Sequence, residues 1–549
     1  MAPSDPTGTT RVPGRRVLWI AVAAVLVLLT AADVSRPARD AGPQALPYSA
    51  PDVVNPMRGQ FDNILTGLFP QSNDAQSGLP DWPGSMDAAD RFTWRSLQPV
   101  DPATLPADAS DEERYDFSQI DRALGRYGSR GMRLSLRISS YDSCCDPSPP
   151  NGVNIGVPDW FAARDGAVQV YDLNGIAQVI PDWNGDGYLD AFGELLAALG
   201  RRYDRDERLA IFEMSGYGDF SENVLPVLRD DLDDPGPAEE FSEAVLGYYS
   251  QYRDQVITAA SVERLVAANL RAFPRTQMVT APGNPQIVKQ LMRDSDALAG
   301  VSHPVGVRSD CLGVFDVLPA WAVDPSSEYV ARGDPIIDVL VDRLTDAPVL
   351  TEWCQLPDDV SRRDYYARGL ASVLDRHVSM TASSGFPDQF DGRQMEPDLY
   401  DLWSRANIYA GYRYDASGEV TSEARGVRAE VLWTNRGVSS THERWTVSYQ
   451  LIDAAGDVIA TVGSGLDLRD IDTAQSSSPD ADVVPTPATA TDSASFAGPV
   501  PRGTYTVAAL VTWDEHKADA THPVEHEPMN LAMPDRRDGA YPIGSVTVR

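Results

Sequence analysis

The sequence predicts a protein of the α/β class: a (β/α)8 barrel of the TIM type, followed by a C-terminal antiparallel β-sandwich that is Ig-like. Two patterns predict this architecture. Between residues 51 and 405, short β-branched runs alternate with amphipathic helical stretches, as in parallel strands joined by helical crossovers. From residue 406 to residue 549 the helical period disappears, and runs that alternate apolar with polar residues are separated by turn formers.

Eight runs are candidate strands of the barrel, with helical stretches between most of them. The candidate strands are Val53–Phe61, Arg91–Leu97, Arg133–Ser139, Leu209–Gly216, Gln277–Thr280, Gly306–Leu312, Pro348–Glu352 and His377–Thr381. The helical stretches include Ser118–Tyr127, Leu189–Tyr203, Ser261–Ala272 and Asp364–Asp375. Eight repeats in about 350 residues fit a (β/α)8 barrel with inserted loops. A doubly wound open sheet is the alternative, although no Gly-rich phosphate-binding loop follows the first strand.

The C-terminal segment has the sequence pattern of a β-sandwich of about 140 residues. Its candidate strands are Val427–Trp433, Arg444–Ile452, Tyr505–Trp513 and Tyr541–Val548. Between them, the Ser/Thr/Pro/Ala-rich stretch Thr473–Ser495 is interpreted as a long flexible loop.

The N-terminus has the features of an export signal. Arg15 and Arg16 precede an uncharged run, Val17–Ala32, and basic residues on that side alone place the rest of the chain across the membrane. The run is short for a spanning helix, so residues 1–33 are either a cleaved signal peptide or a retained signal anchor. Residues 34–50 are Pro/Ala-rich and are expected to form a disordered linker. We therefore expect an extracellular or cell-surface protein, held to the cytoplasmic membrane if the segment is uncleaved.

The net charge of the chain bears on which classes of macromolecule it can bind. The chain carries 80 acidic and 46 basic residues, a formal net charge of −34. A field of that sign repels phosphate backbones, so nucleic-acid binding is disfavoured.

Several short motifs occur in an order that is known from other proteins. The first strand carries NPMRG, the second RFTWRSLQP followed by YDF, and the fourth is followed by GYGDFSE. Asp310-Cys311 follows the sixth strand, and the seventh ends in Thr351-Glu352-Trp353-Cys354. In this order the motifs resemble an uncharacterised bacterial family of barrel-plus-sandwich proteins, itself similar to clan A glycoside hydrolases. Gln98 and Phe220 depart from the family pattern, which has Glu and Trp at these places.

The resemblance implies a glycosidase-like site, and the chemistry points to the same residue type. Glycoside hydrolysis uses two carboxyl groups that flank the scissile bond, and barrel active sites gather at the carboxyl ends of the strands. Glu352 ends the seventh strand and is expected to be the nucleophile, and Glu222, after the fourth strand, the general acid/base. Glu213, inside the fourth strand, is a rival for the acid/base role. Glu222 and Glu352 could instead be ordinary exposed loop acids.

Supporting residues near strand ends are candidates for substrate binding. An arginine can orient a carboxylate or a sugar hydroxyl, and a tryptophan can stack on a sugar face. The candidates are Arg58, Trp94, Arg137, Asp310 and Trp353. Neutralisation of nearby acids and packing in the core are the alternative roles of the arginines and tryptophans.

One stretch resembles a calcium loop. Asp182, Asn184 and Asp186, followed by Gly187, match the first positions of an oxygen-ligand loop, but the bidentate acid at its end is displaced by one residue. The choice is between a structural calcium ion and a capped turn at the start of a helix. No other cofactor is expected.

The four cysteines of an exported chain are expected to be oxidised. Cys311 and Cys354 follow neighbouring strands, whose spacing of about 4.8 Å suits a disulfide. We therefore predict the pair Cys311–Cys354. Cys144 and Cys145 would then form a vicinal bridge or stay reduced.

Two functions remain open at this point. The first is an exported glycoside hydrolase, of the retaining type, that acts on a polysaccharide or glycoconjugate. The second is a non-catalytic cell-surface protein that binds glycans through a decayed glycosidase barrel. The first requires two carboxylates that face one cleft, whereas the second tolerates their separation.

Overall fold

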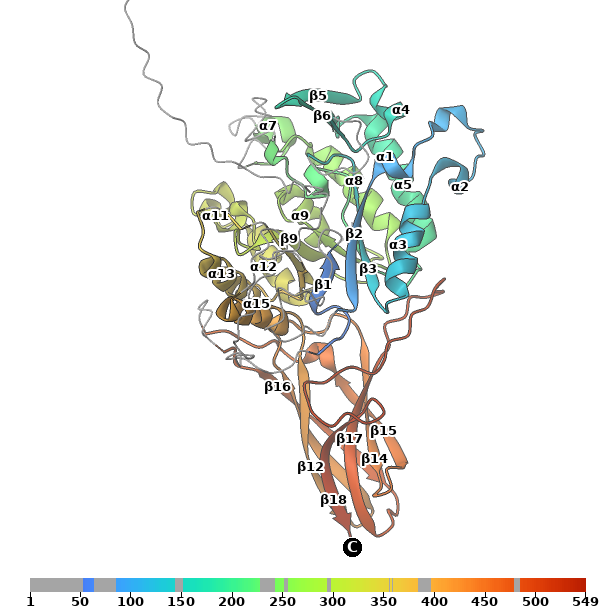
Figure 1. Ribbon diagram of the computed structural model, residues 1–549, viewed down its shortest axis with the longest axis vertical. Coiled ribbons are helices and arrows are strands. Elements are labelled where there is room, and N and C mark those ends of the chain that lie inside the picture. Colours follow the sequence, from blue (N-terminus) through green and yellow to red (C-terminus); the bar gives the residue numbers. More distant parts are fainter. Residues whose placement is uncertain are drawn as a thin grey trace, which may run out of the picture.

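The computed structural model places a barrel and a β-sandwich end to end (Figure 1). It describes residues 53–63, 85–143, 152–227, 242–250, 255–293, 298–354, 356–357, 359–383, 396–477 and 484–549. Within these ranges, parallel strands close into an eight-stranded barrel in the order β1-β11-β10-β9-β8-β7-β3-β2. Two antiparallel sheets follow, ordered β12-β13-β16 and β15-β14-β17-β18. The predicted fold class is therefore confirmed.

The barrel closes because β1 pairs in parallel with both β11 and β2. The barrel strands are β1 (Gly59–Asn63), β2 (Asp87–Thr93), β3 (Arg133–Ser139), β7 (Leu209–Glu213), β8 (Gln277–Thr280), β9 (Gly306–Leu312), β10 (Val349–Trp353) and β11 (Met380–Ala382). A small separate sheet, ordered β4-β6-β5, lies above the barrel in Figure 1 and consists of β4 (Val153–Ile155), β5 (Val168–Leu173) and β6 (Ile176–Pro181).

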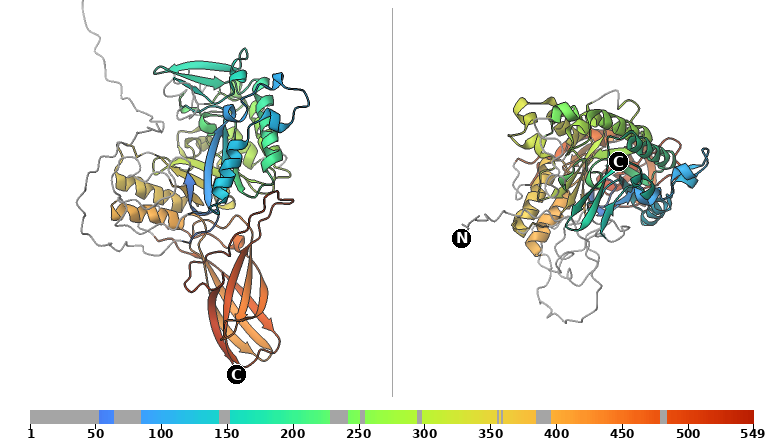
Figure 2. Two further views of the ribbon diagram at one scale, coloured as in Figure 1. Left: turned by 45° about the vertical axis from the view of Figure 1, so that its right-hand side comes forward. Right: turned by 90° about the horizontal axis from the view of Figure 1, so that it is seen from above.

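Helices surround the strands, as the view from above in Figure 2 shows. The longer ones are α3 (Ser118–Gly128), α5 (Asp186–Tyr203), α8 (Ala259–Ala272), α9 (Pro285–Met292), α12 (Pro335–Asp346), α13 (Arg362–Asp375) and α15 (Pro397–Tyr409). Shorter helices are α1 (Trp94–Leu97), α2 (Asp111–Arg114), α4 (Asp159–Ala162), α7 (Ser242–Leu246), α10 (Ala320–Val323) and α11 (Glu328–Arg332). Side-chain caps begin several of them: Thr258 accepts a hydrogen bond from Ser261 N before α8, and Asn284 accepts one from Ile287 N before α9.

The second strand lies earlier in the sequence than predicted. The prediction was Arg91–Leu97, but β2 ends at Thr93 and Trp94–Leu97 forms α1. The Thr93 hydroxyl accepts a hydrogen bond from Ser96 N, which caps the helix, and Trp94 is fully buried. A local cap and a tertiary contact therefore end a run whose composition suits a strand.

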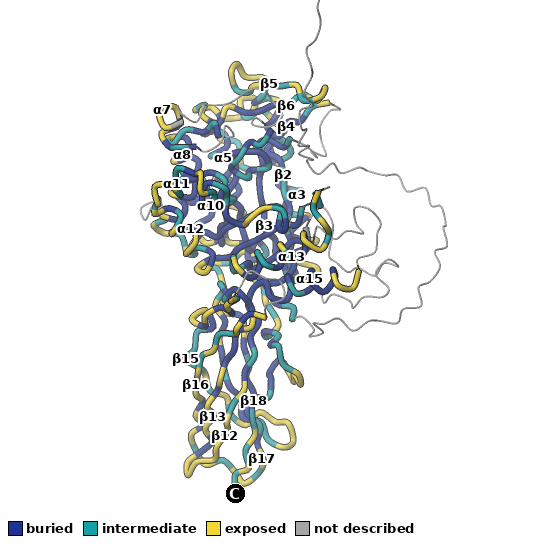
Figure 3. Tube along the Cα trace, turned by 90° about the vertical axis from the view of Figure 1, so that its left-hand side faces the viewer, coloured by how far each residue is buried: buried dark blue, intermediate teal, exposed yellow. Residues whose placement is uncertain are grey.

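The inside of the barrel is layered because side chains alternate along each strand between the interior and the helices. The middle of the interior is an apolar cluster of Met57, Phe61, Ala210, Ile211, Val279, Leu350, Met380 and Ala382. Two residues beyond Ile211 and Leu350 stand Glu213 and Glu352, which lie on the same side of their strands. The apolar layer thus gives way to a polar one toward the carboxyl ends. Figure 3 shows that the barrel strands are mostly buried.

The sandwich packs around an aromatic core that includes Trp433, Tyr449 and Trp445. Its strands are β12 (Tyr414–Glu423), β13 (Gly426–Asn435), β14 (Trp445–Ile452), β15 (Val458–Asp467), β16 (Ala488–Ala497), β17 (Gly503–Trp513) and β18 (Tyr541–Val548). The predicted loop Thr473–Ser495 is wrong in its second half, because β16 pairs with β13 from Ala488 opposite Asn435 to Ala497 opposite Gly426. Small Ser, Thr and Ala residues indicate a loop by composition, but an adjacent strand supplies the hydrogen bonds that make this stretch a strand.

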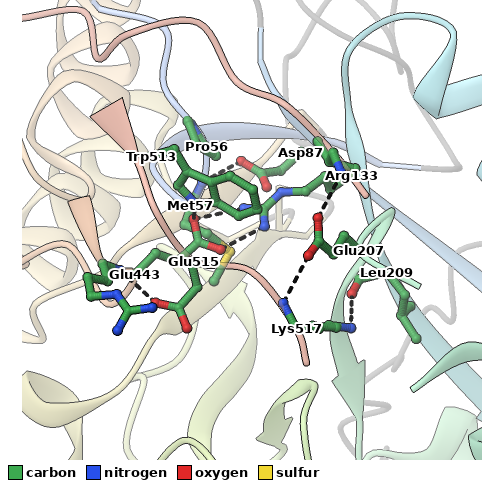
Figure 4. Close-up of polar contacts among 12 residues, drawn as sticks. Pro56, Met57, Asp87, Arg133, Glu207, Leu209, Glu443, Trp513, Glu515 and Lys517 are labelled. Atoms are coloured by element: carbon green, nitrogen blue, oxygen red, sulfur yellow. Dashed lines mark hydrogen bonds and ion pairs between the residues drawn. The ribbon is translucent and has the colours of Figure 1, made fainter. Parts of the chain in front are cut away.

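The sandwich meets the barrel at the end opposite the carboxyl termini of the strands. Arg133, at the start of β3, donates two hydrogen bonds to Glu443, at 2.7 and 2.9 Å. Lys517 reaches from the sandwich into the barrel base, where its Nζ donates to Leu209 O at 2.9 Å (Figure 4). The same Nζ donates to Thr276 Oγ1 at 2.8 Å. A cavity of about 390 Å³ lies between these groups, and Arg133, Glu443 and Lys517 are among the residues that line it. This cavity is therefore a feature of the domain interface.

Several predictions fall outside the described residues. They are the signal peptide or anchor, the linker at residues 34–50, and Cys144 and Cys145. Of the helices in the described ranges, none is both long and apolar enough to cross a membrane.

Candidate functional site

Charged side chains gather at the carboxyl ends of four barrel strands, two on each side of β8 in the strand order. The cluster consists of Arg137 from β3, Glu213 from β7, Arg308 and Asp310 from β9, Glu352 from β10, and Glu222 from the loop after β7. This is the end at which barrel enzymes place their active sites. The sequence prediction that Glu222 and Glu352 face the same region is therefore met by the geometry.

Arg308 is the centre of the cluster. Its Nε lies 3.1 Å from Glu213 Oε2, and its Nη1 lies 3.1 Å from Asp310 Oδ1 and 3.8 Å from Glu222 Oε1. Its Nη2 donates a hydrogen bond to Glu352 Oε2. The side chain is only 6% exposed. One buried guanidinium thus contacts four carboxyl groups.

Glu213 lies beneath the other three acids. Its side chain is 6% exposed, whereas those of Glu222, Asp310 and Glu352 are 24%, 24% and 18% exposed. Ser135 Oγ donates a hydrogen bond to Glu213 Oε1 at 2.9 Å, and Arg137 Nε lies 3.6 Å from Oε2. Its oxygens are engaged by the protein, so Glu213 fits a structural role better than proton transfer to a substrate.

The loop that carries Glu222 is held rigidly. Ser221 Oγ donates to Ile138 O at 2.8 Å and accepts from Gly216 N at 3.0 Å, and Asn223 Nδ2 donates to Ala281 O at 2.8 Å. Glu222 therefore stands between two anchored neighbours.

This loop also has an unusual backbone. Phe220, Ser221 and Asn223 have φ values of 52°, 60° and 63°, and Gly218 has φ 85°. A Cβ at Gly218 would stand 2.7 Å from Val224 N, so glycine is required there on both grounds. Strained backbone that the surrounding structure stabilises is concentrated at functional sites.

The electrostatics of the cluster favour a bound proton. Four carboxyls face two guanidiniums, so the positive charge does not compensate for every carboxylate. Burial, followed by repulsion from Asp310, raises the pKa of Glu222 to about 8, against the opposing effects of Arg137 and Arg308. Burial also raises the pKa of Glu352, and the Arg308 guanidinium is the largest opposing influence.

Arg91 extends the charged region along β2. Its guanidinium lies over the Phe220 ring at 4.4 Å, and its Nε is 3.8 Å from Asp142 Oδ2. Burial raises the pKa of Asp219, in the same loop as Phe220, to about 7. This side of the site is therefore also rich in carboxyl groups.

Two of the five predicted substrate-binding residues, Arg137 and Asp310, belong to the cluster. Arg58 does not, because it precedes β1 at the opposite end of the barrel, where its Nη2 donates to Ile408 O at 2.9 Å. Its position corrects the expectation that it lies at the barrel mouth.

Trp94 and Trp353 lie in the core. Trp94 is 0% exposed and packs against Phe161 with ring centroids 4.9 Å apart. Trp353 is 1% exposed and packs against Tyr365 at 5.3 Å. Neither ring can stack on a sugar from these positions, so the expectation that they bind substrate is not supported.

Sequence reasoning missed Arg308. The signal was available, because Arg308 stands two residues before Asp310 in a strand, so both side chains lie on one face. What the sequence could not provide is the distance from β9 to the loop after β7, which depends on the strand order of the closed barrel.

A disulfide lies beside the cluster. Cys311 and Cys354 are joined, with their Cα atoms 4.4 Å apart, as the sequence predicts. Cys311 follows Asp310 directly, and Cys354 is two residues after Glu352. The bond therefore links the strand ends that carry two of the cluster acids.

The structure gives no support for calcium binding at the calcium-like loop. The Asp182 carboxylate accepts a hydrogen bond from Asn184 N at 3.1 Å, and Asn184 Oδ1 accepts one from Thr258 N at 2.8 Å. Arg264 pairs with Asp186 at 2.5 Å and with Asp190 at 2.7 Å. Among the described residues, no group of three or more His, Cys, Asp or Glu could bind a metal ion. The calcium prediction is not supported, and the stretch is a turn that leads into α5.

No protein-family model matches the chain, and no curated protein does so. Similar solved structures include endo-glycoceramidase II from Rhodococcus sp., 14% identical over 82% of this chain and 100% of its own, with a TM-score of 0.32. A GH5 xyloglucanase from Bacteroides ovatus is 12% identical over 64% of this chain and 75% of its own, with a TM-score of 0.32. Xylanase A from P fluorescens subsp. cellulosa is 12% identical over 53% and 84%, with a TM-score of 0.30.

At such identities and TM-scores the likeness bears on neither the substrate nor the catalytic residues. The fold of this chain rests on its own strand pairing, and the site on its own geometry.

Proposed function

We propose that the protein is an exported glycoside hydrolase of the retaining type, with Glu352 as nucleophile and Glu222 as general acid/base. The observation that carries the proposal is that both carboxyls contact one guanidinium, that of Arg308, at the carboxyl end of the barrel. Both are partly exposed, whereas Glu213 and Arg308 lie beneath them. A sugar ring that enters the mouth would meet Glu222 and Glu352 first.

Both carboxyls contact one guanidinium, so they belong to one site. Retaining enzymes hold their two carboxyls about 5–5.5 Å apart, whereas inverting enzymes separate them by about 6.5–9.5 Å to admit a water molecule. The retaining assignment is part of the proposal, and the stereochemistry of the product tests it. Glu213 is less suited to the acid/base role because Ser135, Arg137 and Arg308 engage its carboxylate.

The reaction follows from the two roles. Glu352 attacks the anomeric carbon while Glu222 donates its proton to the glycosidic oxygen, so the glycosidic bond breaks and a glycosyl-enzyme ester forms. Glu222, now ionised, removes a proton from a water molecule, which attacks the anomeric carbon and releases Glu352. The raised pKa of Glu222 suits the first step, because the acid must carry a proton near neutral pH.

The substrate class and location belong to the same proposal. The N-terminal sequence features support export, so a polysaccharide or glycoconjugate outside the cytoplasmic membrane is the substrate class. Protease treatment of intact cells should degrade the C-terminal sandwich if the chain is held at the surface, and a cleaved form should appear in the medium. Intact chain found only in the cytosol would contradict export.

The test of activity is a screen of the purified protein against aryl glycosides and polysaccharides, with product stereochemistry followed by NMR. We expect hydrolysis with retention of the anomeric configuration for at least one substrate. Binding of a glycan without turnover, at the same site, would instead support a non-catalytic glycan-binding protein. Hydrolysis that persists in Glu352→Gln would place the chemistry elsewhere.

A further inference from the structure

We propose that Arg308, anchored by Glu213, is the positioning residue that divides charge between the two carboxyls of the site, keeping Glu352 as the anion and leaving the proton on Glu222. The inference rests on the proposed function for the roles of the two acids. The location of the proton, however, can be measured without any substrate.

Arg308 is anchored by Glu213. Glu213 Oε2 lies 3.1 Å from Arg308 Nε, and the side chains of both residues are 6% exposed. The Ser135 hydroxyl holds the other oxygen of Glu213 at 2.9 Å. An arginine whose Nε faces a fixed buried carboxylate has little freedom to rotate, so the direction of its two Nη groups is determined.

The two Nη groups of Arg308 have unequal contacts with the acids of the site. Nη2 donates a hydrogen bond to Glu352, whereas Nη1 lies 3.1 Å from Asp310 and 3.8 Å from Glu222. Asp310 is therefore the nearer partner of Nη1, and Glu222 receives only a distant share of the charge. A hydrogen bond to a charged donor stabilises the ionised form of a carboxyl, and Glu352 has that bond while Glu222 lacks it from Arg308.

Other charged groups also face the two acids. Arg137 Nη1 donates to Glu222 Oε1 at 3.2 Å, which opposes protonation, but its Nε is shared with Glu213 at 3.6 Å. Asp219 and Asp310 both repel a negative charge on Glu222. At Glu352, burial and Asp310 raise the pKa above its ordinary value, and Arg137 and Arg91 join Arg308 in opposing that rise. At Glu222, burial and the nearby carboxylates outweigh the two arginines and raise the pKa to about 8.

Infrared difference spectroscopy tests the inference directly, because a protonated carboxyl has a C=O stretch that a carboxylate lacks. The spectrum of the parent minus that of Glu222→Gln should isolate one protonated carboxyl, which titrates near pH 8. Arg308→Gln removes the cation from both Glu213 and Glu352, so new protonated carboxyls should appear. The part of this new signal that belongs to Glu352 should vanish in the Arg308→Gln/Glu352→Gln double variant. In Asp310→Asn, which removes a neighbouring negative charge, the Glu222 signal should titrate about one pH unit lower.

The kinetic readout separates positioning from a merely structural role. Arg308→Gln should lower kcat about 100-fold with little change in KM, and the acid limb of its pH profile should move to higher pH because Glu352 loses its cation. Asp310→Asn should move the alkaline limb to lower pH. Asp90→Asn is the matched control: Asp90 is also buried and pairs with Arg126 at 3.0 Å, but on the outside of β2, so neither limb should move.

The outcomes are distinguishable. A protonated carboxyl that is lost in Glu352→Gln and kept in Glu222→Gln overturns the inference, as does an Arg308→Gln spectrum with no new protonated carboxyl. If Arg308→Gln does not fold, as judged by near-UV circular dichroism, the Asp310→Asn shift decides, and its absence counts against the inference. If the spectra show the expected protonated carboxyls but no glycoside is hydrolysed, the proposed function fails and the division of charge stands.

Discussion

Arg308 Nε lies 3.1 Å from Glu213 Oε2, and this buried contact supports the whole polar layer at the carboxyl end of the barrel. Above it, Glu222, Asp310 and Glu352 are partly exposed and share the remaining charge of the guanidinium. A buried ion pair of this kind adds little to stability but fixes orientation, which is what a pair of reacting carboxyls requires.

Replacing the nucleophile gives the first prediction. Glu352→Gln should lower turnover of an aryl glycoside by at least about 10⁴-fold, because the amide cannot form the glycosyl-enzyme ester. Folding should be retained, since the change removes one negative charge from a cluster that has four acids for two guanidiniums. Activity is measured by release of the aryl alcohol. Glu328→Gln, at an acid on α11, serves as control and should behave like the parent.

Replacing the acid/base gives a different signature. Glu222→Gln should slow substrates with poor leaving groups by about 10²–10⁴-fold, but it should spare formation of the glycosyl-enzyme from substrates with good ones. Azide should then accelerate the second step, because it needs no general base, and a glycosyl azide of retained configuration should accumulate. If Glu213→Gln shows azide rescue and Glu222→Gln does not, the acid/base role moves to Glu213.

The disulfide gives a prediction about stability. Replacing Cys311 and Cys354 together by serine should lower the free energy of unfolding by about 4 kcal/mol, because the bond closes a segment with a sequence separation of 43 residues. Urea unfolding measures the difference. Peptide mapping without reductant checks the pairing, and a link from Cys144 or Cys145 to either partner would contradict it.

The domain interface gives a prediction about pH. Burial lowers the pKa of His442, which lies between the hydroxyls of Ser379 and Ser439 at 3.3 and 3.0 Å, to about 4. The folded state therefore binds this proton less readily than the unfolded state, whose pKa is near 6.5. Above pH 6.5, His442 is neutral in both states and does not lower the free energy of unfolding. As the pH falls from 6.5 toward 4, the unfolded state binds the proton first, so the free energy of unfolding decreases.

The variant His442→Asn removes this proton linkage. Between pH 6.5 and pH 4, the parent should lose on the order of 2 kcal/mol relative to the variant. Melting temperatures of both proteins across this range measure the difference. The comparison is needed because buried acids such as Asp87, whose pKa burial raises to about 7, change the stability of both proteins in the opposite direction. Parallel curves would contradict the prediction.

The ion pair between the domains gives the last prediction. Arg133 and Glu443 are 4% and 12% exposed, so replacing one of them leaves the other charge largely buried. Glu443→Gln should cost about 3–5 kcal/mol of unfolding free energy, and the double variant Arg133→Met/Glu443→Gln should recover part of this cost. A double-mutant cycle in urea measures the coupling. A coupling energy near zero would show that the pair does not hold the domains together.

Much of the fold could be predicted from local pattern. Runs such as Arg133–Ser139 and Gly306–Leu312 are strands as predicted, because alternation and β-branched composition act over a few residues. The same reasoning selected Arg137, Glu222, Asp310 and Glu352, which stand at or just beyond strand ends. Prediction failed where pairing with another strand determines the secondary structure: β16 is a strand because β13 lies beside it.

The sequence by itself therefore determined the two architectures, most of the barrel strands and the set of acids that could react, because these depend on periodicity and on position relative to a strand end. Tertiary structure alone decided which of the charged residues meet. Closure of the barrel brings Arg308 between Glu213 and Glu352, and packing of the helices encloses Trp94. Arg58 lies at the opposite end because β1 begins only after it. The physical reason is that a side chain's face is set by its own strand, whereas its partners are set by strand order and register.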